Sequence, residues 1–191
     1  MLKDWNRVEQ PTAEEIDKRL ANAKNSLLQQ QIAMKEKKLP VIVLLEGWGA
    51  AGKGSVLGKL IKNIDPRFFK VAVMDEPTEE EKRKPFLYRH FVKIPEAGKF
   101  VFMDSGWMSE VTGQKLSGEL SEDEYKKRIE SIKRFERQLT DNGYLLLKFF
   151  FNIDKKEQKK RLKKLEEDKN TAWRVSKHDR WQNKHYEECL E

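Results

Sequence analysis

The sequence predicts an α/β fold in which a parallel sheet is sandwiched between helices. Four short apolar runs have the length and composition of strands, and they occupy residues 41–45, 71–74, 100–103 and 145–151. Helical patterns lie between them, and the runs stay apolar throughout, which is typical of parallel strands covered on both faces. A glycine-rich turn directly after the first run also favours this class, because strand-to-helix turns of that kind bind phosphate.

Capping signals mark the starts of two predicted helices. Thr12 and Glu15 form a capping box, and apolar residues follow at helical spacing, so a helix is predicted within residues 12–38. A second capping box spans residues 121–124 and precedes another helical pattern. Helices that alternate with apolar strands in this way build crossover connections between parallel strands.

The length of 191 residues is enough to bury one sizeable core, so we expect a single domain over residues 1–191. Within it we expect an N-terminal helix at 12–38, an α/β core at 39–153, and a basic helical lid with a C-terminal helix at 154–191. The last helical pattern reaches Glu191 without a C-cap signal. We therefore expect either that the natural chain continues or that this helix frays.

The charge content indicates an anionic partner. Charged residues make up 37% of the chain, and the formal net charge is +7. A nucleic acid, a nucleotide, an inorganic phosphate chain or an acidic membrane would each satisfy that charge. The single cysteine, Cys189, excludes an internal disulfide framework, and no apolar run approaches the roughly 20 residues of a membrane span. We therefore expect a cytoplasmic protein outside the membrane.

The turn after the first strand has the composition of a phosphate-binding loop. Such a loop needs glycines so that backbone N–H groups can surround an anion, a helix whose N-terminus follows, and a lysine for the outer phosphates. The full motif has Ser or Thr directly after the lysine, and here Ser55 comes one residue later. A glycine-rich turn with a chance lysine is the structural alternative. The predicted phosphate-binding residues are Gly47, Gly49, Ala50, Ala51, Gly52, Lys53, Gly54 and Ser55.

A carboxylate follows the third apolar run. Asp104 ends residues 100–103, which is where an enzyme with a phosphate loop holds Mg²⁺ beside the phosphates. An aspartate that caps the next helix is the alternative. We predict that Asp104 is the metal ligand and that Mg²⁺ is the cofactor.

The end of the second apolar run offers candidate substrate residues. Open α/β sheets bind ligands at the carboxyl ends of their strands, and Glu76 follows such an end. Thr78 and Glu81 also form a capping box, so a structural role for this segment is equally compatible. Arg89 could reach a phosphate, with a surface ion pair as its competitor. We assign Glu76 and Arg89 to substrate binding.

The segment after the last strand is a strongly basic helix. Residues 154–168 contain few apolar anchors and an intensely basic first half. A solvated helix is the plain interpretation. A lid that folds over phosphates is favoured, because the segment directly follows the final core strand.

These segments together resemble the second family of polyphosphate kinases, which transfer phosphoryl groups from inorganic polyphosphate to nucleotides. The proline-threonine-glutamate segment at 77–79 and the proline-phenylalanine-leucine segment at 85–87 look most like the branch that phosphorylates AMP to ADP, in which two such domains are often fused in tandem. The matching positions are residues 45–48, 50–54, 77–81, 85–87, 157–158, 161–162 and 173–175, with Pro95, Gly98, Asp104 and Trp107.

The resemblance implies a fold of the thymidylate-kinase type with a helical lid after the last core strand. It implies that Arg161 and Arg174 are lid residues that face polyphosphate, with Arg161 acting in catalysis beside Lys53 and Asp104. Arg174 would bind substrate. We expect polyphosphate and a nucleotide, AMP or ADP, as partners, no nucleic acid, and either a homo-oligomer or a tandem partner domain.

Two positions depart from the family's pattern. The family's loop carries an acidic residue two positions after the first glycine, where this chain has Gly49. The family also shows an arginine soon after Asp104, where this chain has Glu110, an acid that would repel polyphosphate. An active phosphotransferase and a catalytically weak or silent polyphosphate-binding domain of a tandem enzyme are therefore the two hypotheses. Binding of nucleic acid would rest on charge alone.

The Gly49 position separates these hypotheses. If the missing acid limits the domain, Gly49→Asp should raise turnover, unless the backbone there needs positive φ. If the chain is strongly active as it stands, another carboxylate such as Glu46 or Asp75 must replace the missing one. We predict a phosphotransferase that moves a phosphoryl group between polyphosphate and a nucleotide.

Overall fold

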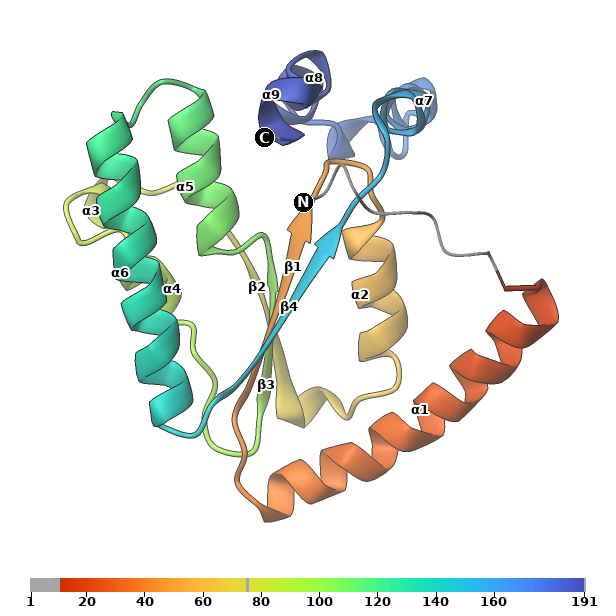
Figure 1. Ribbon diagram of the computed structural model, residues 1–191. Coiled ribbons are helices and arrows are strands. Elements are labelled where there is room, and N and C mark those ends of the chain that lie inside the picture. Colours follow the sequence, from red (N-terminus) through yellow and green to blue (C-terminus); the bar gives the residue numbers. More distant parts are fainter. Residues whose placement is uncertain (1–10, 75, 191) are drawn as a thin grey trace.

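The computed structural model describes residues 11–74 and 76–190, and these contain a parallel sheet flanked by helices (Figure 1). The sheet has four strands in the order β2-β3-β1-β4. Their bounds are Val41–Gly47 for β1, Phe69–Val73 for β2, Phe100–Asp104 for β3 and Leu145–Phe151 for β4. The predicted α/β fold is confirmed. The second strand begins two residues earlier than the apolar run suggested and ends before Met74.

Alternate side chains of the central strands enter two separate cores. Ile42 and Leu44 of β1 pack on one side of the sheet, while Val41, Val43 and Leu45 pack on the other. All five side chains are buried. A strand covered on both faces must be apolar at every position, which is why the run shows no alternation.

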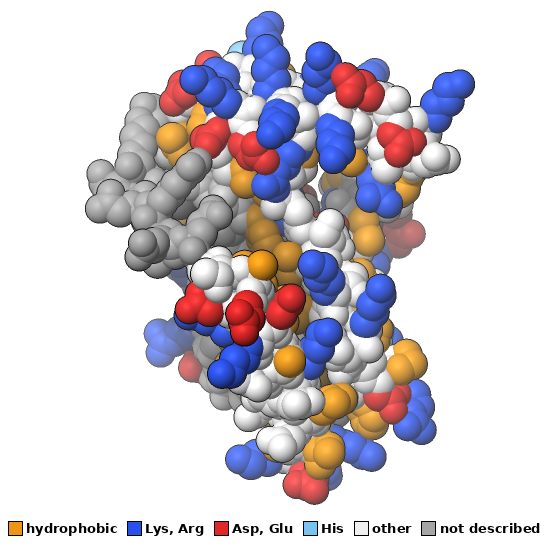
Figure 2. Space-filling view, turned by 90° about the vertical axis from the view of Figure 1, so that its right-hand side faces the viewer, with side chains coloured by type: hydrophobic (Ala, Val, Ile, Leu, Met, Phe, Trp, Pro, Cys, Tyr) orange, Lys and Arg blue, Asp and Glu red, His pale blue; other side chains and the backbone are white. Residues whose placement is uncertain are grey.

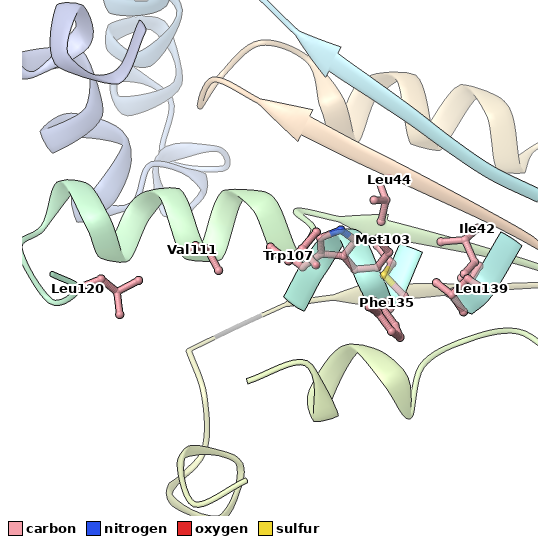
Figure 3. Close-up of a cluster of buried hydrophobic side chains, with 11 residues drawn as sticks. Ile42, Leu44, Met103, Trp107, Val111, Leu120, Phe135 and Leu139 are labelled. Atoms are coloured by element: carbon pink, nitrogen blue, oxygen red, sulfur yellow. The ribbon is translucent and has the colours of Figure 1, made fainter. Parts of the chain in front are cut away.

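The first core lies between the sheet and the helices α5 (Trp107–Leu116) and α6 (Glu122–Asp141). The short helices α3 (Glu79–Lys82) and α4 (Tyr88–Phe91) lie on the same side (Figure 1). Trp107 occupies the middle of this core, beside Phe135 and Met103 (Figure 3). Its ring meets that of Phe135 edge to face at 5.2 Å, and its indole N–H donates to Glu136 over 2.8 Å. The hydrogen bond satisfies the polar group of a buried tryptophan.

The second core is covered by α2 (Lys53–Ile61) and by the end of α1 (Ala13–Glu36). The short η2 helix (Pro66–Phe68) joins this side of the sheet to β2. The capping box of Thr12 and Glu15 starts α1 as predicted. Only the last turns of α1 are buried, at Gln31 and Met34, and Leu20 remains 44% exposed.

The C-terminal segment lies above the carboxyl ends of the strands (Figure 1). It contains α7 (Lys155–Glu167), η3 (Ala172–Arg174), α8 (Lys177–Lys184) and α9 (Tyr186–Leu190). The edge strand β4 leads into α7 and keeps apolar side chains exposed, including Phe149 at 50%. Within residues 11–74 and 76–190, none of the helices combines the length and the apolar character that crossing a bilayer requires.

Candidate active site

The phosphate loop connects β1 to α2, and its shape depends on two glycines. Gly47 has φ +123°, and a Cβ atom there would collide with the backbone of Phe151 on the neighbouring strand. Gly52 has φ +102° and immediately precedes the first residue of α2. Both φ values lie in the region that favours glycine. The resulting turn places the N-terminus of α2, with its positive potential, at the carboxyl end of the sheet.

A cavity of about 1100 Å³ opens beside this loop and brings together most of the predicted site. Sheet register explains how Asp104 reaches the loop, because Leu45 of β1 pairs with Asp104 of β3. The basic segment contributes Arg161 and Arg174 from above. The predicted residues that line the cavity are Gly49, Ala50, Ala51, Gly52, Lys53, Gly54, Ser55, Asp104, Arg161 and Arg174.

Lys53 is half-buried and folded against the loop. Its ammonium group donates to the carbonyl oxygens of Gly47 and Trp48 over 3.0 and 3.1 Å. Burial lowers the pKa of Lys53, and the negative charge of Asp104, followed by that of other nearby carboxylates, opposes this effect. The lysine is therefore held at the loop by the backbone and by carboxylates around the cavity.

Asp104 does not cap the helix that follows it. The N-cap of α5 is Gly106, which offers no side chain for capping. Glu46, near the end of β1, lies beside Gly106 at the start of α5. Burial raises the pKa of Glu46, and the backbone N–H groups of Ser109 and Met108 partly oppose the rise. Because Gly106 and not Asp104 occupies the N-cap position, the capping alternative for Asp104 is wrong.

The basic helix α7 lies over the phosphate loop as the lid hypothesis requires. Figure 2 shows Lys and Arg side chains gathered on the upper part of the molecule, where α7 lies. The Arg161 guanidinium donates to the carbonyl oxygens of Ala50 and Ala51 over 3.4 Å each and to Glu157 over 2.7 Å. Arg174 is exposed at the cavity and lies 5.4 Å from the ring centre of Trp173.

Two glutamines of the C-terminal segment bind the backbone of Gly49. The N–H of Gly49 donates to Gln182 Oε1 over 2.9 Å, and Gln158 donates to the Gly49 carbonyl over 3.3 Å. Gln158 is completely buried and also donates to Gln182 over 3.0 Å. The neighbouring Trp48 stacks on Tyr186 with ring centres 4.2 Å apart. These contacts were not predicted: Gln158 was noted only as a position that matches the family, and no local pattern distinguishes Gln182 from a solvated helix residue.

A smaller pocket of about 280 Å³ adjoins the large cavity and shares Met74 and Ser105 with it. It contains the other predicted substrate residues, Glu76 and Arg89. Arg89 is buried, so the surface ion pair considered from the sequence is not what the structure contains. The predicted substrate residues are thus divided between two adjoining hollows.

Glu110 occupies the smaller pocket and does not line the cavity of the phosphate loop. Its Oε2 atom lies 3.1 Å from His90 Nε2 and 3.7 Å from Arg89 Nη1. His90 is completely buried against Trp107, with ring centres 5.7 Å apart. Glu110 thus pairs with basic groups in the smaller pocket, away from the phosphate loop, and its repulsion of polyphosphate stays a prediction.

The chain matches the model of one protein family over residues 10–190, and the description of that model is "Polyphosphate kinase 2 (PPK2)". This chain belongs to the polyphosphate kinase 2 family. The resemblance inferred from the sequence motifs is thereby confirmed.

Relatives of known name agree with this assignment. A polyphosphate:AMP phosphotransferase of Pseudomonas aeruginosa is 33% identical over 172 residues, which cover 90% of this chain and 35% of the relative. An ADP-polyphosphate phosphotransferase of Rhizobium meliloti is 30% identical and is matched over 57% of its length. This chain therefore spans about a third to somewhat over half of these polyphosphate kinase relatives.

Solved structures of the family share the fold. A polyphosphate kinase 2 of Arthrobacter aurescens superposes with a TM-score of 0.92 at 24% identity, covering 100% of this chain and 70% of the other. A putative polyphosphate kinase 2 of Pseudomonas aeruginosa gives a TM-score of 0.90 at 25% identity, covering 99% of this chain and 41% of the other.

The carboxylates of the cavity fit a cation that shares its coordination with substrate. No group of three or more His, Cys, Asp or Glu side chains in the described part of the chain could hold a metal by itself. Asp104 and Asp179 both line the cavity of the phosphate loop. Mg²⁺ is bound in such enzymes by one or two carboxylates together with substrate phosphates. The donor set of this polyphosphate kinase family member therefore suits a cation of that kind.

Proposed function

We propose that this chain transfers a phosphoryl group between inorganic polyphosphate and a nucleotide, with AMP converted to ADP. The observation that carries the proposal is the single cavity in which the phosphate loop, Asp104 and Arg161 meet, in a chain of the polyphosphate kinase 2 family. A chain of phosphates needs positive charge along its binding site, and α7 contributes Arg161 and Lys164 to the lining of this cavity.

The side chains around the cavity would position the phosphates and stabilise their charge. Backbone N–H groups of the loop and the N-terminus of α2 would hold oxygens of the donor. Lys53 would balance the charge that spreads over the transferred group, after leaving the carbonyl oxygens that it contacts here. Arg161 lies directly above the loop, where it would bind the donor and exclude water.

The adjoining pocket has the position expected for the acceptor nucleotide. It opens into the large cavity at Met74 and Ser105, so an acceptor bound there could meet the end of the donor. Arg89, with Glu76 nearby, would bind the nucleotide. AMP is proposed because the chain is 33% identical to a protein named for that acceptor.

We propose Mg²⁺ as the divalent cation of this reaction, with Asp104 as a ligand. When bound, such a cation neutralises charge on the phosphates and orients them. Asp104 is suited to hold it because β3 ends at the edge of the cavity and because the side chain is not committed to capping α5.

The alternative is a domain that binds polyphosphate without transferring it. The observation in its favour is Gly49, which stands where the family's loop carries an acid. Both hypotheses predict binding of polyphosphate, and only the first predicts formation of ADP.

Formation of ADP tests the proposal directly. Purified chain would be incubated with polyphosphate, AMP and Mg²⁺, and the nucleotides would be separated by chromatography. We expect ADP from the wild type and a large loss in Lys53→Ala, with an unchanged circular dichroism spectrum. Binding of polyphosphate without ADP would favour the silent domain, and failure to bind polyphosphate would reject both hypotheses.

We also propose that the chain functions in the cytoplasm, where nucleotides are available, and in a homo-oligomer or beside a tandem partner domain. The exposed apolar side chains of β4 and α1, such as Phe149 and Leu20, support a protein contact. Light scattering over a range of concentrations would test self-association. A monomer at every concentration would contradict the homo-oligomer.

A further inference from the structure

Gly49 has little space for a side chain because a carboxylate already lies beside it. Its backbone is outside the positive-φ region, so conformational freedom does not explain the glycine. A Cβ atom at Gly49 would collide with Oδ1 of Asp179 and would lie 2.8 Å from Asp179 Cγ. The space next to the loop position at which the family carries an acid is therefore filled by an acid from α8, 130 residues further along the chain.

Asp179 is held in this position by the N-terminal cap of α8 and by a nearby hydrogen bond between α8 and the loop. It is the third residue of α8, and its Oδ2 atom accepts from the backbone N–H and the hydroxyl of Ser176 over 2.8 and 2.7 Å. Gln182 lies three residues later on the same face of the helix and accepts from the N–H of Gly49 over 2.9 Å. The capping box leaves Oδ1 directed at the loop.

The charge of Asp179 acts on the cavity. Burial lowers the pKa of Lys53, and the carboxylates of Asp104, Asp179 and Glu46 oppose that shift, in this order of size. Asp179 also lines the same cavity as Asp104 and the phosphate loop. Asp179 and Asp104 are thus two of the three carboxylates that line the space where the phosphates would bind, with Asp168 as the third and Lys53 among the basic side chains.

The other carboxylates considered for this task have different surroundings or lie outside the described residues. Glu46 lies beside the first turn of α5 and shares a pocket with Gly49, Lys53 and Asp179, but it does not line the cavity that contains Asp104. Glu110 faces His90 and Arg89 in the adjoining pocket. Asp75 is outside the described residues.

We propose that Asp179 replaces the acid that the phosphate loop lacks at Gly49, and that it holds the divalent cation together with Asp104. The inference rests on the proposed function and favours an active domain over a silent one. It also implies that the cation site is complete only while α8 lies on the loop. Closure of the C-terminal segment and binding of the cation would then be coupled.

Binding measurements without turnover test the role of Asp179. Calorimetry would compare the affinity for tripolyphosphate in Mg²⁺ and in EDTA for the wild type, Asp179→Asn and Glu187→Gln. The asparagine keeps the size and an oxygen for the helix cap but removes the charge. Glu187→Gln removes a charge from an exposed residue of the same C-terminal segment that does not line the cavity, so it is the matched control for a general charge effect.

In the wild type we expect Mg²⁺ to strengthen binding, with a coupling in the usual range of about 5–150-fold. Asp179→Asn should lose most of this gain and should bind tripolyphosphate more tightly than the wild type in EDTA, because one repulsive charge is gone. Glu187→Gln should keep the gain. An unchanged Mg²⁺ gain in Asp179→Asn, or an equal loss in Glu187→Gln, would overturn the inference.

Relocating the carboxylate tests whether its position matters. Asp179→Ala should reduce ADP formation by ~10²–10⁴-fold, and Gly49→Asp combined with Asp179→Ala should recover part of it, since the acid returns to the space it left. Gly49→Asp alone should lower activity and the melting temperature, because two carboxylates then compete for one space. Gly49→Asp with wild-type or higher turnover would contradict the inference.

Failure of the proposed function and failure of the role of Asp179 would give different results in these measurements. A wild type that forms no ADP but shows a Mg²⁺ gain dependent on Asp179 would reject the transfer reaction and support the cation assignment. A wild type that forms ADP while Asp179→Asn matches it in every measurement would support the reaction and reject the role of Asp179.

Discussion

Three glycines of the phosphate loop are required for different physical reasons. Gly47 combines a left-handed φ with close approach to the backbone of Phe151. Gly52 needs only the left-handed φ, since a Cβ atom there would meet nothing within 4 Å. Gly49 has neither constraint and is limited by the carboxylate of Asp179. Replacing these three glycines should therefore have three different consequences.

Gly47→Ala should destabilise the fold by about 2 kcal/mol or more, because both the φ angle and the β4 backbone oppose a side chain. Gly58→Ala is the control. Gly58 lies inside α2 with open space around its Cβ position, so alanine should raise stability by about 0.5–1 kcal/mol. Urea unfolding of both variants measures these free energies. Equal stability of the two variants would show that the turn tolerates side chains.

Glu46 should make stability depend on pH. Its pKa in the folded protein is raised above the ordinary value of 4.5, chiefly by burial. Its contribution is therefore fully present below the unfolded pKa and is lost as the pH rises through the folded pKa. The difference in unfolding free energy between wild type and Glu46→Gln should fall as the pH rises above the ordinary pKa of 4.5 and should level off above the raised pKa of the folded protein. A difference that grows with pH, measured by urea unfolding, would contradict this assignment.

At the scale of elements, the C-terminal helices determine the state of the loop. The N–H of Gly49 is bound by Gln182, and Trp48 stacks on Tyr186 of α9. When a phosphate binds, the Gly49 N–H must leave Gln182, or other N–H groups of the loop must bind the phosphate instead. Docking of α8 and α9 is thus part of the site and not only a cover for it.

Gln182→Ala should loosen α8 and α9 without unfolding the sheet, because it removes the acceptor for Gly49 and for Gln158. We expect faster amide hydrogen exchange across residues 177–190 and unchanged protection in β1 and β3. Lys184→Ala, at an exposed position of the same helix, is the control. Slow exchange of α8 in Gln182→Ala would mean that other contacts hold the segment.

At the scale of the whole molecule, positive charge is concentrated above the loop. The formal net charge is +7, the sequence of α7 is rich in lysine, and Lys and Arg side chains gather on the upper part of the molecule (Figure 2). A linear polyanion bound there would release condensed counterions, as nucleic acids do when they bind basic proteins. Affinity for polyphosphate should therefore fall steeply as salt is raised.

Two neighbouring lysines of α7 can distinguish the effect of a charge at the cavity from the effect of the overall positive charge. Lys164 lines the cavity, whereas Lys163 does not and lies 3.7 Å from Glu167. Lys164→Ala should weaken polyphosphate binding and reduce the salt slope by about one unit, with a smaller effect of Lys163→Ala. Calorimetry at three ionic strengths gives both slopes. Equal effects of the two variants would place polyphosphate outside the cavity.

Local signals in the sequence determined the strands, the capped helices and the phosphate loop. The apolar runs predicted β1 to β4 because buried parallel strands have no polar face. Asp104 was found because it directly follows such a run, and Lys53 because it ends the glycine-rich turn after another. The basic composition of 154–168 likewise indicated the segment that lies over the loop. In each case the functional residues lie within, or next to, the local sequence pattern that predicted them.

Only the tertiary structure decided which distant side chains complete the site. Gly49 appeared as the loss of an acid, and its meaning changed when Asp179 and Gln182 were found beside it. Glu46 precedes the loop and Glu110 follows Asp104 in sequence, but Glu46 lies beside α5 and Glu110 lies in the adjoining pocket. The periodicity of a helix says which residues share a face, and it does not say what that face meets. That is decided by how α8 packs across the carboxyl end of the sheet.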